Sequence, residues 1–146
     1  EEEDDADPQL REATLERIRM MRMYALTEAL ELDEATAAKL FPYLREGDKK
    51  LEAFQMQKRE CRTSLRTMVK EDRYDDKMVP KLLRCLSEAE VALAQEQGKQ
   101  VQGLAAILST EQQVKFVMVR QRFEDEVRMM LHERRRERRR EHREQR

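Results

Sequence analysis

Two cysteines are the residues of this chain whose chemistry depends most directly on spacing. Cys61 and Cys85 each lie twelve residues from Arg73, which stands within a polar stretch. If antiparallel helices flank that stretch, the cysteines lie level with each other and a disulfide is geometrically plausible. It would contribute about 3 kcal/mol to stability and would agree with an oxidising compartment. The alternative is two buried thiols that pack as small apolar residues.

Methionine is frequent in this chain, with nine residues, and several alternate with arginine near both ends of the predicted helical part. The set consists of Arg19, Met20, Met21, Arg22, Met23, Arg128, Met129 and Met130. One interpretation is a surface for clients or partners, because flexible thioether side chains adapt to varied apolar groups. Two others remain open: a thioether site for a soft metal such as Cu(I), and ordinary core packing.

The two histidines, His132 and His142, are ten residues apart. This spacing does not place them on one turn, so they do not form a two-histidine helical metal site. A weak zinc site assembled across a dimer is one hypothesis, and solvated side chains are the other. We expect no cofactor, with a metal ion as the one exception considered. The sequence contains no nucleophile–base pair, phosphate-binding loop or cysteine cluster, so it does not predict an enzyme.

The C-terminal stretch is rich in arginine. Residues Leu131–Arg146 carry eight Arg against four Glu, whereas Glu1–Asp7 carry six acids and no base. The basic stretch could bind nucleic acid or anionic lipid electrostatically, or contact an acidic partner or the acidic leader. Because it lacks aromatic side chains for base stacking, we expect no specific recognition of nucleic acid.

Composition sets the fold class. Charged residues make up 42% of the 146 residues and aromatic residues 5%, with three Gly and three Pro. This mixture favours long helices in one domain. No apolar run approaches the ~20 residues of a membrane span. The chain begins with Glu, and we expect either a mature form whose signal peptide has been removed or a fragment.

Hydrophobic spacing predicts four helices. We expect a disordered leader over residues 1–8, a helical domain over 9–131 and a charged tail over 132–146. The first helix should run from about Gln9 to Glu31. Its apolar face is expected to include Leu15, Ile18, Met21, Met23, Ala25, Leu26, Ala29, Leu30 and Leu32. Asp33 should cap the second helix, which kinks at Pro42 and ends at Lys70.

The second and third helices carry long seams at alternating steps of three and four residues. In the second helix the seam runs through Leu44, Gly47, Leu51, Phe54, Lys58, Cys61, Leu65 and Met68. Asp75 or Asp76 should cap the third helix, with Pro80 in its first turn. Its seam runs through Val79, Leu82, Leu86, Ala89, Leu93, Gln97, Val101, Leu104 and Leu108. These patterns predict helix-on-helix packing.

A fourth helix follows, with Ser109 or Thr110 as its cap. Its apolar face consists of Phe116, Val119, Phe123, Val127 and Met130. After Leu131 the chain continues as a solvated helix or a frayed tail. Four helices of such unequal length leave apolar surface exposed in one copy, and a homodimer would cover it.

The starts of the second and fourth helices repeat a short pattern. Leu32, Asp33 and Thr36 correspond in position to Leu108, Ser109 and Gln112. This pattern resembles the LTxxQ motif of the Spy/CpxP family of bacterial periplasmic stress proteins and heavy-metal sensor domains. The resemblance covers roughly residues 17–130.

The resemblance implies an all-α, four-helix, elongated hooked hairpin that forms a dimeric cradle in the periplasm. The function it favours is ATP-independent binding of unfolded or misfolded clients on a curved helical face. The alternative is a sensor or regulatory domain, for heavy metals or envelope stress, that modulates a membrane signalling partner. A structural coiled-coil adaptor is a third hypothesis.

Overall fold

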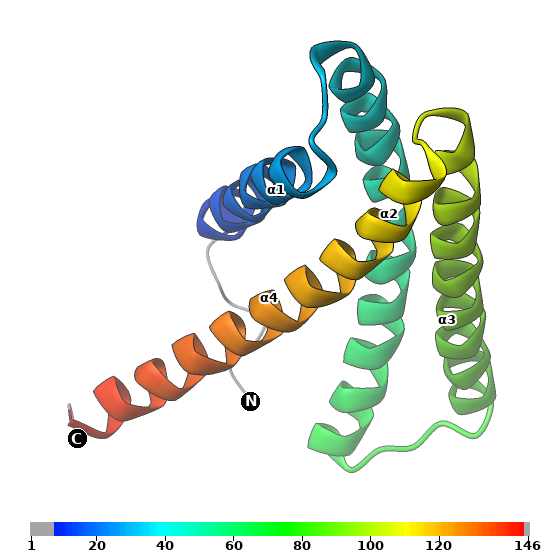
Figure 1. Ribbon diagram of the computed structural model, residues 1–146. Helices are drawn as coiled ribbons and strands as arrows, with labels where there is room; N and C mark the ends of the chain where they lie inside the picture. Colours follow the sequence, from blue (N-terminus) through cyan, green and yellow to red (C-terminus); the bar gives the residue numbers. More distant parts are fainter. Residues whose placement is uncertain (1–7, 145–146) are drawn as a thin grey trace. The chain divides into compact units, whose positions relative to one another are not determined.

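The computed structural model describes residues 8–144, with the side chains of Pro8–Arg11, Leu131, Arg134, Arg135 and Arg138 outside the description. Over this range the chain is helical and contains no strand, which confirms the predicted all-α class. The elements are α1 (Pro8–Leu30), α2 (Glu34–Glu71), α3 (Met78–Gly103), a 3₁₀ turn η1 (Leu104–Ala106) and α4 (Thr110–Glu144) (Figure 1).

Parts of the predicted terminal segments lie outside the described residues. Of the acidic leader, residues 1–7 are not described, and Pro8 already belongs to α1. The charged tail is helical as far as Glu144, so α4 runs through most of the segment that we separated from the helical domain. Among the described helices, none is both long enough and apolar enough to cross a membrane.

The chain divides into two compact units. One contains residues 1–37 and 109–146, and therefore α1 and α4; the other contains residues 38–108, and therefore most of α2 with α3 and η1. In the first unit α1 contacts α4, and Leu26, Leu30, Phe116 and Val119 are its buried apolar residues.

In the second unit, α2 and α3 pack side by side and run antiparallel (Figure 1). The Tyr43 hydroxyl donates a hydrogen bond of 2.7 Å to the Gln100 carbonyl oxygen. Further along, Lys58 pairs with Glu90 at 3.2 Å, and Cys61 is bonded to Cys85. As the residue number rises along α2, the number of the contacting residue on α3 falls, as expected for antiparallel helices. The two helices therefore contact each other from Tyr43 to Cys61 of α2.

Short polar side chains define where the helices begin. The Asp33 carboxylate accepts a hydrogen bond of 2.7 Å from the Thr36 backbone N–H, and the Asp75 carboxylate accepts bonds from the N–H groups of Lys77 and Met78. The first contact confirms Asp33 as the cap of α2. Asp75 instead caps the turn that leads into α3, because the residue directly before α3 is Lys77, which has no side-chain cap bond.

Two helices end on a residue with positive φ. Glu31 follows α1 with φ 49°, and Asp72 follows α2 with φ 50°. After α1, the Leu32 N–H donates to the Thr27 carbonyl and the Glu31 N–H to the Glu28 carbonyl. This is the Schellman arrangement, which usually places glycine where Glu31 stands.

The predicted seam of α2 is confirmed, because every residue in it is buried or half-buried. The seam of α3 is correct except at Gln97, which is exposed. At that level Glu96 and Gln100 turn toward α2: Glu96 lies 3.8 Å from Lys50, and Gln100 is buried. At this level α3 therefore directs Glu96 and Gln100 toward α2, and not Gln97 as predicted.

The predicted continuation of the third helix to Leu108 is wrong. Helix α3 ends at Gly103, and η1 follows. A Cβ atom at Gly103 would overlap the hydroxyl of Tyr43, so a residue with poor helix propensity stands where α3 must approach that ring. Leu104 and Leu108 are nevertheless both buried, because the tighter turn keeps them on the inner side.

The predicted apolar face of the first helix is partly wrong. Leu26 and Leu30 are buried, but Leu15, Met21 and Met23 are exposed, as is Met130 at the end of the predicted face of α4. The inner stripe of α1 instead consists of Thr14, Ile18, Arg22, Ala25, Leu26, Ala29 and Leu30. Short or polar residues occupy part of this stripe, so hydrophobic spacing alone did not reveal it.

Helix α2 continues through Pro42.

Candidate functional surface

The second copy of the repeated pattern forms a capping box. The Ser109 hydroxyl accepts a hydrogen bond of 3.2 Å from the Gln112 N–H, and the Gln112 side-chain carbonyl accepts one of 3.1 Å from the Ser109 N–H. Each side chain thus satisfies a backbone donor of the other, which fixes the start of α4. Leu108, directly before the box, is buried.

The Gln112 side chain also reaches a second helix. Its amide nitrogen donates a hydrogen bond of 3.2 Å to the carbonyl oxygen of Leu30, the last residue of α1. The last carbonyl groups of a helix have no N–H donor within that helix, so a side chain from another segment can donate a hydrogen bond to them. Gln112 therefore joins the start of α4 to the end of α1.

The first copy of the pattern, at Leu32–Thr36, has the same capping contact as the second copy but no hydrogen bond to another helix like that of Gln112. Asp33 bonds to the Thr36 N–H as Ser109 bonds to that of Gln112. Thr36 has a short hydroxyl side chain, so it cannot reach a neighbouring helix as the longer Gln112 amide does. Both copies therefore mark helix starts, and only the second also fastens two helices.

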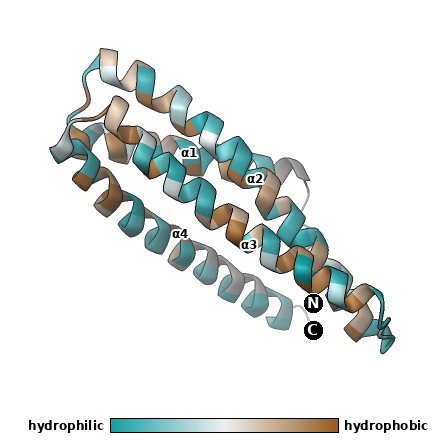
Figure 2. Ribbon diagram, turned by 90° about the vertical axis from the view of Figure 1, so that its right-hand side faces the viewer, coloured by the Kyte–Doolittle hydropathy of each residue, from teal (hydrophilic) through white to brown (hydrophobic). Residues whose placement is uncertain are grey.

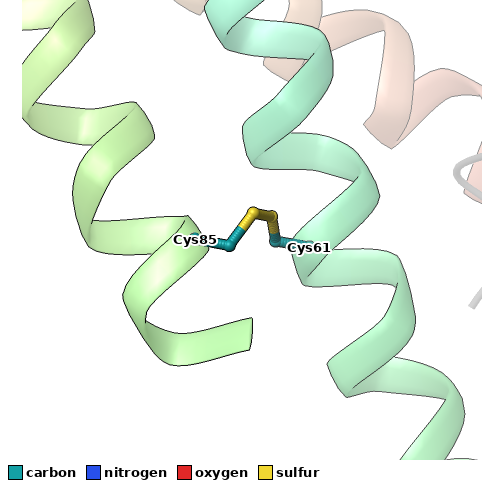
Figure 3. Close-up of a disulfide and its surroundings, with 2 residues drawn as sticks. All are labelled: Cys61 and Cys85. Carbon is teal, nitrogen blue, oxygen red and sulfur yellow. A yellow bond between two sulfur atoms is a disulfide. The ribbon is translucent and has the colours of Figure 1, made fainter. Parts of the chain in front are cut away.

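Cys61 and Cys85 form a disulfide, with their Cα atoms 6.3 Å apart (Figure 3). Cys61 comes from the inner side of α2, where it is buried, and Cys85 from the adjacent side of α3. Of the two alternatives left by the sequence, the structure contains the bonded pair.

The methionine and arginine residues singled out from the sequence do not form one patch. Because each helical step turns the chain by about 100°, Met20, Met21 and Met23 point in three directions from α1. Met20 is the most exposed of the three, at 66%. In α4, Met129 is likewise 66% exposed, and Arg128 lies 4.0 Å from Asp125.

Sequence reasoning missed three further exposed residues, one on α1 and two on α4. Tyr24, one turn from Met20, is 66% exposed, and Val114 and Met118, one turn apart on α4, are 58% and 60% exposed. The Tyr24 hydroxyl donates to the Glu28 carboxylate at 2.8 Å, and this bond raises the pKa of the phenol. Spacing by four residues places each pair on one helix face, but this signal does not distinguish an exposed pair from a buried one.

His132 and His142 are both exposed on α4. Within the described part of the chain, no three His, Cys, Asp or Glu side chains are grouped closely enough to hold a metal ion.

No family model matches this chain, and no curated protein or solved structure matches it either.

Proposed function

We propose that this chain is a chaperone-like protein that binds unfolded segments of other proteins, without ATP, through apolar side chains on α1 and α4. The observation that carries the proposal is the exposure of Met20 with Tyr24, and of Val114 with Met118, as pairs one helical turn apart. Clusters of exposed large apolar side chains typically mark interaction sites.

The composition of these pairs suits clients of varied sequence. Methionine is unbranched and polarisable, so it adapts to differently shaped apolar groups. Arg17 precedes Met20 by three residues, and Arg122 follows Met118 by four. Arg19 and Arg120 are nearer in sequence, but they pair with Glu16 and Glu124. Positive charge around apolar contacts would attract acidic stretches of a client and would weaken with salt.

The proposal includes a dimer built on an elongated, hooked helical hairpin. Its support is an uncharged outer stripe on α3 in a chain that is otherwise densely charged. The stripe consists of Pro80, Leu83, Ser87, Val91 and Ala94, all exposed and spaced by three or four residues. Such spacing suits packing against another helix, and a second copy offers the same stripe by symmetry.

We also propose a periplasmic location. The resemblance of Leu108, Ser109 and Gln112 to the LTxxQ motif supports it, as does the disulfide between Cys61 and Cys85. Structural disulfides persist mainly in oxidising compartments such as the periplasm.

An aggregation assay tests the function. At a near-stoichiometric ratio, the protein should suppress light scattering from an unrelated, thermally unfolding enzyme. The double variant Met20→Glu/Tyr24→Glu should lose most of this activity, because both charges fall on the proposed surface. Met56→Glu/Val69→Glu is the matched control, since these residues are also exposed but belong to α2.

Two outcomes contradict the proposal: equal suppression by the wild type and the α1 variant, or no suppression by the wild type. Circular dichroism should show that both variants keep their helical content, because all four positions are on the surface.

A further inference from the structure

In the C-terminal half of α4, the glutamates and the arginines with described side chains fall in different arcs of the helix, and Figure 2 shows this half as largely hydrophilic. The glutamates Glu133, Glu137, Glu141 and Glu144 fall within a narrow arc when each residue turns the helix by 100°. That arc continues the stripe of Phe116, Val119, Phe123 and Val127, which is buried or half-buried in the first half of α4.

Four of the arginines with described side chains occupy the adjacent arc of the same segment. They are Arg136, Arg139, Arg140 and Arg143, and all are exposed. We call them the outer arginine face. His132 shares this side, and no acidic residue between His132 and Glu144 falls on it. The face is therefore a compact run of positive charge along a straight helix.

This charge pattern does not stabilise an isolated helix. Residues four apart are neighbours on a helix surface, and Arg136–Arg140, Arg139–Arg143, Glu133–Glu137 and Glu137–Glu141 are all pairs of like charge. Like charges at this spacing are destabilising. Arg140–Glu144 is an opposite pair, as are Glu133–Arg136 and Glu137–Arg140 at the three-residue spacing. A polyanion on the outer arginine face would relieve the repulsion among the arginines.

Apolar residues on the same side of α4 indicate which polyanion this is. Val114, Met118 and Met129 lie on the helix side that the outer arginine face continues, and they are 58%, 60% and 66% exposed. Asp125 also falls on this side, between Met118 and Met129, and its carboxylate lies 4.0 Å from Arg128. A lipid interface accommodates apolar side chains together with arginine. The phosphate backbone of a nucleic acid would contact only the arginines, and the outer arginine face carries no Asn, Gln, Ser or Thr for base edges.

We propose that the outer side of α4 binds the surface of a membrane that contains anionic phospholipid. The outer arginine face contacts the lipid phosphates, and Met118 and Met129 enter the interface. The attraction is electrostatic and falls off within a Debye length, so it should be strongly dependent on salt. This surface shares Met118 with the proposed client surface, whereas the outer arginine face belongs to the membrane surface alone. Met20 and Tyr24 belong to α1, so the Met20→Glu/Tyr24→Glu variant should lose client binding and keep vesicle binding.

Vesicle co-sedimentation of the full chain tests this proposal. The protein should bind vesicles that contain roughly one third phosphatidylglycerol in phosphatidylcholine, and should remain in solution with pure phosphatidylcholine. Raising the salt from about 50 to 300 mM should weaken binding at least roughly tenfold. The variant Arg136→Gln/Arg139→Gln/Arg140→Gln/Arg143→Gln should weaken it to a similar degree, because Gln keeps helix propensity but removes the charge.

Two controls separate this surface from net charge and from other polyanions. Arg62→Gln/Arg66→Gln/Arg73→Gln/Arg84→Gln removes four exposed cations from the other unit and should change binding less than about threefold. Met118→Gln/Met129→Gln should weaken vesicle binding while leaving its salt dependence unchanged. The proposal is overturned if the α4 arginine variant binds vesicles like the wild type. It is equally overturned if a 20-base-pair DNA duplex, at equal phosphate concentration and salt, binds more tightly than the vesicles.

Discussion

The side-chain amide of Gln112 donates a hydrogen bond of 3.2 Å to the carbonyl oxygen of Leu30 and so fastens the first turn of α4 to the last turn of α1. The same side chain accepts a bond from the Ser109 N–H through its other polar atom. Both functions of one amide are thus used, one within its own helix and one between helices. A residue that can only accept would lose the second contact and keep the first.

The variant Gln112→Glu should separate these two contacts. Glutamate at this position can still complete the capping box, but its carboxylate would face the Leu30 carbonyl without a proton to donate. We expect a loss of about 1–3 kcal/mol in the free energy of unfolding, measured by urea denaturation at neutral pH. Ser109→Ala should cost about 1 kcal/mol because it removes only a cap. Equal stability of Gln112→Glu and the wild type would show that the interhelical bond contributes nothing.

Two glycines of the second unit should respond to alanine in opposite directions. A Cβ atom at Gly103 would overlap the Tyr43 hydroxyl, whereas a Cβ atom at Gly98 meets no atom within 4 Å. Gly98→Ala should therefore stabilise the protein by about 0.5–1 kcal/mol through helix propensity, and Gly103→Ala should destabilise it by about 1–3 kcal/mol. Thermal unfolding of both variants checks the signs.

A second substitution distinguishes steric overlap at Gly103 from a backbone effect. In Tyr43→Phe the hydroxyl is absent, so adding Gly103→Ala should cost less there than in the wild type. Tyr43→Phe alone should cost about 1 kcal/mol, because it removes the bond to the Gln100 carbonyl. A full cost of Gly103→Ala in both backgrounds would argue against the overlap.

The disulfide should contribute measurably to stability. Cys61 and Cys85 are 24 residues apart in sequence, and a loop of this size corresponds to about 3 kcal/mol in the chain-entropy model. Reductant should lower the free energy of unfolding by about that amount and leave Cys61→Ser/Cys85→Ser unaffected. Mass spectrometry after alkylation of untreated protein should find no modified thiol; two modified thiols would show that the pair is reduced.

The ion pair at the start of α4 should add a pH-dependent contribution to stability. The Lys115 amine lies 2.7 Å from the Glu111 carboxylate; this contact lowers the pKa of Glu111 and raises that of Lys115. A lowered carboxyl pKa stabilises the fold above the unfolded pKa of about 4.5, and this stabilisation disappears as the pH falls through the folded pKa.

Glu111→Gln should therefore make the urea midpoint less sensitive to acid between pH 6 and pH 3. The effect should be small, because both side chains are at the surface and water screens them. Glu60→Gln, an exposed position on α2, serves as the control. A steeper acid dependence in Glu111→Gln than in the wild type would reverse the expected sign.

The outer stripe of α3 should govern dimer formation. Leu83→Glu/Val91→Glu places two charges on the uncharged stripe, and like charges would oppose each other across a symmetric interface. We expect analytical ultracentrifugation to show a dimer for the wild type and a monomer for this variant. Met56→Glu/Val69→Glu should remain dimeric, and a monomeric wild type at about 100 µM would contradict the proposed dimer.

Local chemistry in the sequence was sufficient to predict where helices begin. Asp33 caps α2 as expected, and Ser109, one of the two candidates, caps α4, because a cap depends only on a short polar side chain and the next three backbone N–H groups. Asp75, one of two candidates for the third helix, caps the turn directly before α3. The seam from Leu44 to Met68 was equally predictable, since one continuous apolar stripe on a long helix has one side to bury.

Only the tertiary structure decided which side of α1 faces inward. Leucine and methionine occur around most of that helix, so the apolar pattern fits several rotations, and the actual inner stripe contains Thr14 and Arg22. Contact with α4 selects among these rotations. The exposed pair of Met20 and Tyr24 follows from that choice and could not be separated from the core beforehand.

The sequence by itself determined the helical class, the cap at Asp33 and the level positions of Cys61 and Cys85, because these depend on residues close in the chain or on simple antiparallel geometry. It left open whether the two cysteines are bonded. The tertiary structure decided the end of α3 at Gly103, the shift from Gln97 to Glu96 and Gln100, and the bond from Gln112 to Leu30. These features depend on atoms from segments distant in sequence, such as the ring of Tyr43 against Gly103. No periodic pattern within one helix contains that information.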